Sequence, residues 1–394
     1  MGIRSRYLWA GLAMALGACV QAPPPSPVSS AVSPGSECRS IAALIAFDFE
    51  GAPASPCAVL GERDFAVLVT PEHAPPINPS PWYAFRYESA GDAPVTVTLR
   101  YLGGTHRYAP KLIKDGGAAS DLPVTISKDG TSATLRLPAG RGTVTAQELV
   151  LPGDASADLR RWSALVGTVP FSLGQSHDGR PIEAVRLGRV DAPRLVVLLG
   201  RQHPPEVTGA IAMRAFADHL ALMFARDPAL GQHTQVLIVP QLNPDGVARG
   251  HWRANRGAVD LNRDWGEFTQ PETRSVKLWL DALPQGVRPV AMIDFHSTAR
   301  NLFYVQGDEA SAAQQRFLAS WLTGRENTFA GYDFTIEPRN ANPGSGTAKN
   351  WFHAVYAIPA YTYEVGDASD RAATRAAAAE LAAGLITALD QMAQ

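Results

Sequence analysis

Three side chains of the 394-residue sequence have the types and the placement of ligands for a single zinc ion. His203 and Glu206 are separated by two prolines, and His296 ends an apolar run farther along the chain. A catalytic zinc site takes nitrogen and oxygen ligands from three side chains and keeps one position for water. Zinc held in this way makes water nucleophilic near neutral pH. The pattern therefore predicts a site for one zinc ion.

The surrounding elements place these residues at one edge of a predicted sheet. Leu195–Leu199 is continuously apolar, which is typical of a strand buried on both faces, and Ile211–Phe224 has apolar residues at helical spacing. His203 and Glu206 lie on the turn between them, and such turns line the binding crevice of open α/β sheets. An isolated pair of this kind is more often a surface histidine and a carboxylate at the start of a helix. The surrounding motifs must therefore decide between that interpretation and a metal site.

Six short motifs resemble, in order and in rough spacing, those of the zinc carboxypeptidase family. They are His203-Pro-Pro-Glu206, Asn243-Pro-Asp-Gly246, Trp252-Arg253, Asp260-Leu-Asn-Arg263, Asp294-Phe-His296 and Tyr363-Glu364. The closest likeness is to the cytosolic-carboxypeptidase-like, deglutamylase-like branch, which includes bacterial members. The resemblance covers the chain from about Phe171 to its end, and it implies a metallocarboxypeptidase that hydrolyses the C-terminal peptide bond.

The resemblance also implies a role for each matched residue. Glu364 would be the general base and acid, and Arg253 would stabilise the oxyanion of the tetrahedral intermediate. Asn262 and Arg263 would bind the free carboxylate of the substrate. Asp294 would accept a hydrogen bond from one of the ligand imidazoles, without the sequence showing which one.

Lys349 suggests which terminal residue the enzyme removes. It lies 15 positions before Glu364 in Gly346-Thr-Ala-Lys349, where branch members that remove acidic residues have Gly-Thr-Gly-Arg. A cation at this position implies a preference for C-terminal Glu or Asp. The alternative is a solvated lysine at the start of a helix.

One feature of the family is missing from the sequence. A mobile tyrosine usually precedes the catalytic glutamate, but residues 339–346 read RNANPGSG. Tyr332 and Tyr356 are the nearest tyrosines, and neither is assigned to this role. Among the remaining histidines, His251 is expected to lie nearest the substrate because it neighbours Arg253.

The N-terminal residues have the pattern of an export signal and a linker. Arg4 and Arg6 precede an apolar core that is too short to span a bilayer, so residues 1–18 are predicted to be a signal peptide. The segment before Cys19 resembles a bacterial lipoprotein processing site, and Cys19 would then carry a lipid anchor. The alternative is an ordinary signal that is cleaved nearby. Residues 19–37 are rich in Pro and Ser and are predicted to be a linker.

This signal implies the periplasmic side of a bacterial cell envelope, with the protein anchored to a membrane or secreted into the periplasm. In that oxidising compartment the other two cysteines, Cys38 and Cys57, can pair as a disulfide. The chain has 35 basic and 37 acidic residues, which gives no reason to expect a nucleic-acid partner. A peptide with a free C-terminus is the expected ligand, and no protein partner is predicted.

Residue patterning predicts two folded domains. Residues 38–160 contain short alternating runs between Gly- and Asp-rich turns, which is typical of a small antiparallel β-sandwich. Residues 161–394 alternate strands with helices. This alternation predicts an α/β catalytic domain, with a mixed, mostly parallel twisted sheet covered by helices on both faces.

Two other functions remain open at this point. The first is an amidohydrolase, because some relatives of this fold use the same metal ligands to hydrolyse murein peptides or N-acyl amino acids. Asn262 and Arg263 favour a peptide C-terminus as the substrate instead. A non-catalytic peptide-binding module would have lost a metal ligand or the base, and the sequence keeps all of them.

Overall fold

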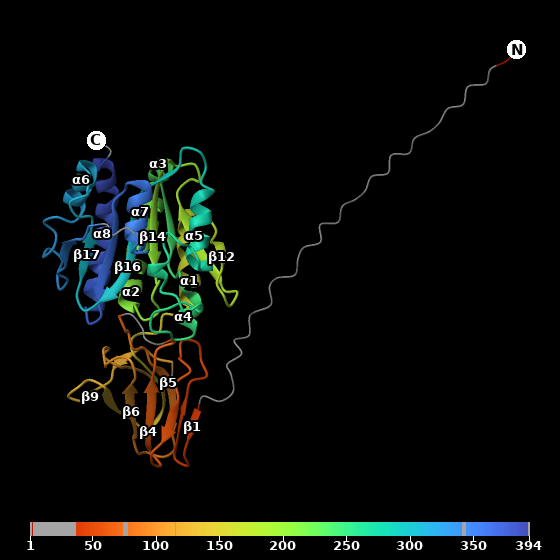
Figure 1. The fold of residues 1–394 in the computed structure, drawn as a ribbon, viewed down its shortest axis with the longest axis vertical. Helices are drawn as coiled ribbons and strands as arrows, with labels where there is room; N and C mark the ends of the chain where they lie inside the picture. The colour runs from red at the N-terminus through yellow and green to blue at the C-terminus, as the bar shows by residue number, and fades with distance from the viewer. Residues whose placement is uncertain (1, 3–36, 74–77, 115, 341–343, 393–394) are drawn as a thin grey trace. The chain divides into compact units, whose positions relative to one another are not determined.

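The computed structural model describes residues 2, 37–73, 78–114, 116–340 and 344–392. The chain divides into two units, Met1–Val32 and Ser33–Gln394. Nearly all of the first unit lies outside the described residues, and so do Cys19 and most of the predicted linker. The signal peptide, the lipid anchor and the linker therefore remain predictions. The second unit contains both folded regions (Figure 1).

Residues 37–145 form the predicted β-sandwich from two sheets. The first has the order β1 (Glu37–Arg39), β2 (Ala43–Ala46), β5 (Ala84–Ser89), β11 (Gly140–Thr145), β7 (Lys111–Ile113), β8 (Ser120–Asp121). The second has the order β3 (Cys57–Val59), β4 (Asp64–Val69), β6 (Val95–Tyr101), β10 (Ser132–Leu137), β9 (Val124–Ile126). Neighbouring strands are antiparallel, except that β4 and β6 are parallel. The predicted disulfide is confirmed, and Cys38–Cys57 joins the two sheets through β1 and β3.

The catalytic region contains a mixed sheet of eight strands, four of whose seven neighbouring pairs are parallel. Its order is β12 (Phe171–Gln175), β13 (Pro181–Leu187), β15 (Thr234–Val239), β14 (Arg194–Gly200), β16 (Arg288–Thr298), β19 (Ala360–Gly366), β17 (Leu302–Val305), β18 (Thr335–Pro338). The central parallel strands β14 and β15 are almost entirely buried, because helices cover both faces of the sheet. The predicted fold class is confirmed.

Different helices cover the two faces of this sheet (Figure 1). One face packs against α1 (Pro152–Val166), α2 (Val207–Arg226), α6 (Ala312–Trp321) and α8 (Arg371–Met392). The other packs against α5 (Pro271–Asp281) and α7 (Ala348–Tyr356). Three short helical turns complete the region: α3 (Leu230–His233), α4 (Pro244–Ala248) and η1 (Leu261–Arg263). By length and composition α2 and α8 could cross a membrane, but here they pack against each other and against the sheet.

The junction between the two regions lies near α1. This helix was not predicted from the sequence. The boundary that we place at residue 160 falls inside this helix, where Leu159 and Trp162 pack into the core of the catalytic region. In return, Val207 and Trp252 of the catalytic region pack into the core of the β-sandwich. The two regions therefore share apolar contacts.

Candidate active site

The structure brings the three predicted metal ligands together. His203 and Glu206 lie on the turn between β14 and α2, and His296 lies on the adjacent strand β16. One ligand atom of each residue lies within 4.8 Å of the others. All three side chains are buried. A glycine makes this approach possible, because a Cβ on Gly209 in the first turn of α2 would lie 2.5 Å from the carbonyl oxygen of His296.

The donor set fits a divalent zinc ion. Glu206 is the N-cap residue of α2, yet its side chain makes no capping bond. Its two oxygens instead lie 2.8 Å from His203 Nδ1 and 2.7 Å from His296 Nδ1. Burial alone would raise the pKa of Glu206, but the two imidazoles outweigh it and hold the pKa well below its usual range. Two imidazole nitrogens and a charged carboxylate are ligands that zinc accepts.

A second carboxylate fixes the far side of each imidazole. Asp260 Oδ1 lies 2.8 Å from His203 Nε2, and Asp294 Oδ2 lies 2.7 Å from His296 Nε2. Both contacts turn Nδ1 of the ring towards the shared centre. The structure thus gives Asp294 a definite partner, His296. The motif Asp260-Leu-Asn-Arg263 gave no indication in the sequence that Asp260 orients a ligand histidine.

Glu364 lies on β19 directly beside His296 on β16. Its Oε2 is buried and has no hydrogen-bond partner among the described residues. Burial raises the pKa of Glu364 to about 7. A carboxyl group that titrates near neutral pH and has an unused oxygen can exchange a proton with a neighbouring group.

Arg253 is fixed from two directions. Its Nε donates to Asp260 Oδ2 at 2.6 Å, so Asp260 bridges this arginine and His203. Glu72 of the β-sandwich accepts from the backbone N–H of Trp252 at 2.7 Å and of Arg253 at 2.9 Å. It also accepts from the backbone N–H of Ala254. A carboxylate from one domain therefore orders the loop that carries an arginine of the other.

These groups face one cleft with a volume of about 890 Å³. Of the predicted residues, its walls include His203, Glu206, His296, Glu364, Arg253, Asn262, Arg263 and Lys349. The walls also carry Arg107, Arg339 and Asp367, to which the sequence analysis assigns no role. Cations outnumber anions in this lining, so the cleft suits an anionic ligand.

Asn262 and Arg263 lie together on η1. Asn262 Oδ1 accepts from the backbone N–H of Ala348 at 2.9 Å, which ties η1 to the start of α7. Gly346 packs directly against Arg263, since a Cβ there would lie 2.2 Å from the Arg263 carbonyl oxygen. This contact places the predicted carboxylate-binding pair next to the segment that carries Lys349.

Lys349 is buried rather than solvated, so the surface alternative is wrong. Its side chain lines the cleft with only 5% of the residue exposed. Nζ donates to the carbonyl oxygen of Arg339 at 2.8 Å and to Asn350 Oδ1 at 3.3 Å. Burial lowers the pKa of Lys349 to about 8, and the attraction of Glu309 offsets only part of that effect.

Tyr304 is a cleft tyrosine that the sequence analysis missed. Neither Tyr332 nor Tyr356 lines the cleft, and the Tyr332 hydroxyl lies 2.8 Å from that of Tyr363 in the core. Tyr304 on β17 lies opposite Thr362 on β19, so it shares a face of the sheet with Thr362 and Glu364. The sequence signal that could have found it is the alternation of side chains along β17 (Leu302–Val305), which turns every second side chain towards one face.

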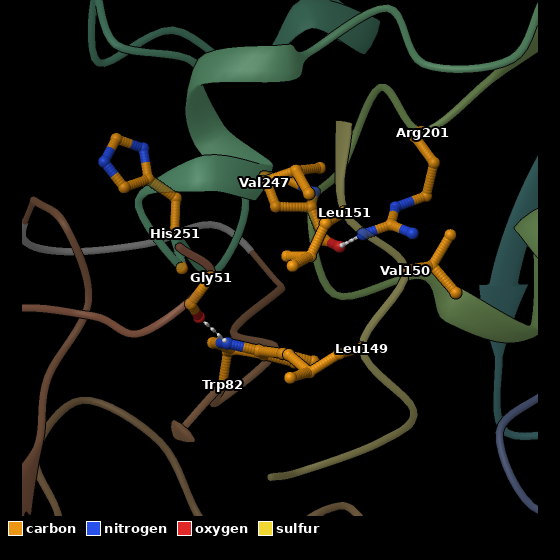
Figure 2. Close-up of a pocket in the computed structure, with 10 residues that line it drawn as sticks. Gly51, Trp82, Leu149, Val150, Leu151, Arg201, Val247 and His251 are labelled. Carbon is orange, nitrogen blue, oxygen red and sulfur yellow. Dashed lines mark hydrogen bonds between the residues drawn. The ribbon is translucent and has the colours of Figure 1, made fainter. Parts of the chain in front are cut away.

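A second, enclosed cavity lies at the junction of the two regions and is too small for a peptide (Figure 2). Its volume is about 10 Å³, which is room for about one water molecule. Arg201 reaches it and donates to the carbonyl oxygen of Pro204 at 2.6 Å, while Trp82 Nε1 donates to Gly51 at 2.8 Å. His251 lines this cavity and not the large cleft, so the expectation that it lies nearest the substrate is wrong.

Comparison with known proteins agrees with this architecture. The sequence profile described as zinc carboxypeptidase matches residues 167–381, more than half of the chain. The chain belongs to the zinc carboxypeptidase family.

Curated relatives match over shorter stretches. Cytosolic carboxypeptidase 6 of Mus musculus is 25% identical over 209 residues, covering 48% of this chain and 38% of that protein. An uncharacterized protein of Zymomonas mobilis is 35% identical over 115 residues, covering 28% of this chain and 29% of that protein. The chain thus matches less than half the length of these relatives.

Solved structures share the fold over most of the chain. The metallo-carboxypeptidase from Burkholderia cenocepacia superimposes with a TM-score of 0.73 at 18% identity, covering 88% of this chain and 99% of that one. The metallo-carboxypeptidase from Pseudomonas aeruginosa, in complex with (2-guanidinoethylmercapto)succinic acid, gives 0.69 at 19% identity, covering 88% and 99%. At this identity the likeness shows a common fold.

Proposed function

We propose that this protein is a zinc-dependent metallocarboxypeptidase that removes an acidic residue, Glu or Asp, from the C-terminus of a peptide. One observation carries the proposal: a single cleft contains the three metal ligands, Glu364 and a buried lysine. Membership of the zinc carboxypeptidase family supports the reaction class. The acidic preference rests on the charge of the cleft.

His203, Glu206 and His296 would hold one zinc ion, which when bound supplies a Lewis acid and lowers the pKa of water. Asp260 and Asp294 keep both imidazoles in the orientation that this requires. Glu364 takes a proton from the attacking water at Oε2, the oxygen that has no hydrogen-bond partner among the described residues. It then gives that proton to the leaving nitrogen.

Two further groups act on the peptide itself. Arg253, held by Asp260 and through its backbone by Glu72, presents a fixed cation to the oxyanion that develops as the amide is attacked. Asn262 and Arg263 bind the free carboxylate of the terminal residue, for which the planar guanidinium is suited. Binding of this carboxylate limits the reaction to the end of a chain.

Lys349, Tyr304 and Arg339 form the pocket for the terminal side chain. Lys349 Nζ uses two hydrogen bonds to neutral oxygens, and a third N–H remains for a ligand because an ammonium has three donors. Arg339 lies over the Tyr304 ring, with its guanidinium carbon 5.3 Å from the ring centroid. An acidic side chain would neutralise the buried ammonium, whereas an apolar one would leave its charge uncompensated.

The catalytic proposal is tested by metal analysis of the purified protein together with a panel of N-blocked dipeptides that differ only in the last residue. We expect about one zinc per chain and release of terminal Glu that chelation and Glu364→Gln both abolish. A metal-loaded protein that is inert towards every free C-terminus would contradict the proposal. Assays with murein peptides and N-acyl amino acids would then separate an amidohydrolase from a binding module.

We also propose that the protein is lipid-anchored through Cys19 on the periplasmic side of a bacterial envelope. The sequence pattern of residues 1–19 supports this location, and the Cys38–Cys57 disulfide is typical of an oxidising compartment. Cys19→Ala is expected to move the protein from the membrane fraction to the soluble fraction. Retention of that variant in the membrane would contradict the anchor.

A further inference from the structure

We propose that the β-sandwich supplies a substrate-binding residue, Arg107, which donates hydrogen bonds to a backbone carbonyl of the peptide upstream of the scissile bond. This inference rests on the proposed carboxypeptidase function. Arg107 lies in the loop between β6 and β7, and its side chain lines the same cleft as His203, Glu206 and Glu364. It is therefore a β-sandwich side chain within the wall of the active site.

The order of residues along β19 gives the direction in which the peptide crosses the cleft. Thr362 lies opposite Tyr304, whose ring lies under the Arg339 guanidinium. The Arg339 carbonyl oxygen accepts from Lys349 Nζ, so the Lys349 pocket lies on the Thr362 side of Glu364. Glu364 follows, and Asp367 comes just after the end of the strand. At about 3.3 Å per residue, Asp367 lies on the order of 10 Å beyond Glu364, away from that pocket.

The position of Arg107 is fixed at that far end. Its Nε donates to Asp367 Oδ2 at 2.8 Å, and Nη2 lies 3.5 Å from the carbonyl oxygen of Ser297, the residue after the ligand His296. A peptide whose terminal side chain reaches Lys349 and whose scissile bond lies at Glu364 must continue towards Arg107. The catalytic glutamate thus separates the pocket for the last residue from the site for the residues before it.

The charge and hydrogen bonds of Arg107 select a neutral acceptor. Asp367 already neutralises the guanidinium, so an acidic substrate side chain gains little there. A guanidinium has five N–H groups, of which the bonds to Asp367, Ser80 and Ser297 use three. The remaining donors form part of a planar fork whose orientation is fixed. A peptide carbonyl is a neutral acceptor of this kind.

Space for additional residues continues past this arginine. A neighbouring cavity of about 360 Å³ shares Arg107, Asp367 and Ala368 with the catalytic cleft. Lys111 of the β-sandwich and Arg371 of α8 form other parts of its wall. A longer peptide therefore has a continuous path along the junction of the two regions, with Arg107 at its entrance.

The test compares two substrates with the same terminal Glu in the zinc-loaded full-length protein. One is an N-acyl glutamate whose only amide is the scissile bond, and the other is an acetylated pentapeptide. We expect Arg107→Gln to lower kcat/KM about tenfold for the pentapeptide and less than about twofold for the N-acyl glutamate. Arg107→Lys keeps the positive charge but lacks the planar set of guanidinium donors. Its kcat/KM for the pentapeptide should therefore lie between the values of Arg107→Gln and the unsubstituted protein.

Arg86→Gln is the matched control because Arg86 is also a β-sandwich arginine paired with an aspartate, Asp48, and it lines neither the cleft nor the neighbouring cavity. It should change both substrates by less than about twofold. An equal loss on both substrates in Arg107→Gln, or no loss on either, would overturn the inference and leave Arg107 as a contact between domains.

A binding measurement separates this inference from the proposed function. In the Glu364→Gln background, calorimetry should show that Arg107→Gln raises the Kd of the acetylated pentapeptide about tenfold and leaves the Kd of the N-acyl glutamate unchanged. If the unsubstituted protein hydrolyses neither substrate, the carboxypeptidase proposal fails, while this Kd ratio still decides the role of Arg107. Equal Kd changes for both ligands would refute it.

Discussion

The two ends of the cleft are built by different parts of the molecule. At one end, the pocket of Lys349, Arg339 and Tyr304 comes entirely from the catalytic region. At the other, Arg107 of the β-sandwich meets Asp367 of the catalytic region. Under the two proposals, recognition of the terminal side chain requires one domain, whereas recognition of the preceding residues requires both.

The electrostatics of the two ends differ in the same way. Both hydrogen-bond acceptors of Lys349 are neutral oxygens, so its charge remains available to an acidic ligand. Arg107 is paired with a carboxylate at 2.8 Å, so its charge is already compensated. We infer that one end distinguishes side-chain charge and the other detects peptide length. Four predictions test this division, in order of decreasing effect.

The largest effect should come from the residue between the two ends. Glu364→Gln removes the group that carries the proton, so kcat should fall by about 10²- to 10⁴-fold for every substrate, whatever its length or terminal residue. Steady-state kinetics with metal content as a second measurement tests this. Glu380→Gln, an exposed glutamate on α8, is the control and should keep full activity. A loss confined to acidic or to long substrates would contradict a shared catalytic centre.

Lys349→Ala should impair only the terminal side-chain pocket. We expect kcat/KM for terminal Glu to fall about ten- to hundredfold, because a charge-assisted bond is lost, while neutral terminal residues are cleaved as before. Lys277→Ala serves as the control, since Lys277 pairs with Asp281 on the surface of α5. Unchanged relative rates for acidic and apolar termini would refute the acidic pocket.

Glu72→Ala tests whether the β-sandwich also acts on the catalytic centre without touching substrate. The loop of Arg253 would lose an acceptor for three backbone N–H groups, and kcat should fall about fivefold, or about 1 kcal/mol, on short and long substrates alike. Glu62→Ala, an exposed position in the same domain, is the matched control. A loss that grows with peptide length would assign Glu72 to the upstream end instead.

The smallest effect should be a pH dependence of specificity. Burial penalises the charged form of Lys349 and lowers its pKa to about 8, so the cation is present below that pH and is lost above it. The ratio of kcat/KM for terminal Glu over terminal Gln should therefore be halved near pH 8 and decline further at higher pH. In Lys349→Arg the ratio should stay constant over this range, because guanidinium does not deprotonate. A constant ratio in the unsubstituted protein would exclude Lys349 as the charge sensor.

Much of the catalytic region could be predicted because its signals are local. The apolar strand, the turn and the helix around His203 and Glu206 follow from residue periodicity and agree with β14 and α2. The helix α1 was not predicted, because its apolar pattern is weak in the sequence.

The roles of Arg107, Glu72 and Asp260 could not be predicted in this way. Arg107 and its partner Asp367 are 260 positions apart, and Glu72 lies 180 positions before the backbone N–H of Trp252 to which it binds. Periodicity shows which side chains are buried but gives no information about which distant polar groups meet. Tyr304 shows the same limit, because alternation along β17 indicates which face of the sheet it occupies but not that Thr362 lies opposite it.

The amino-acid sequence by itself determined the ligand types, the order of the motifs and the alternation of strands and helices, since each depends on neighbouring residues. Only the tertiary structure decided which carboxylate orients each histidine and that Lys349 is buried. It also decided that the β-sandwich forms part of the cleft wall. The physical reason is that the strength and specificity of charged contacts depend on distance and burial, which are set when remote segments pack together.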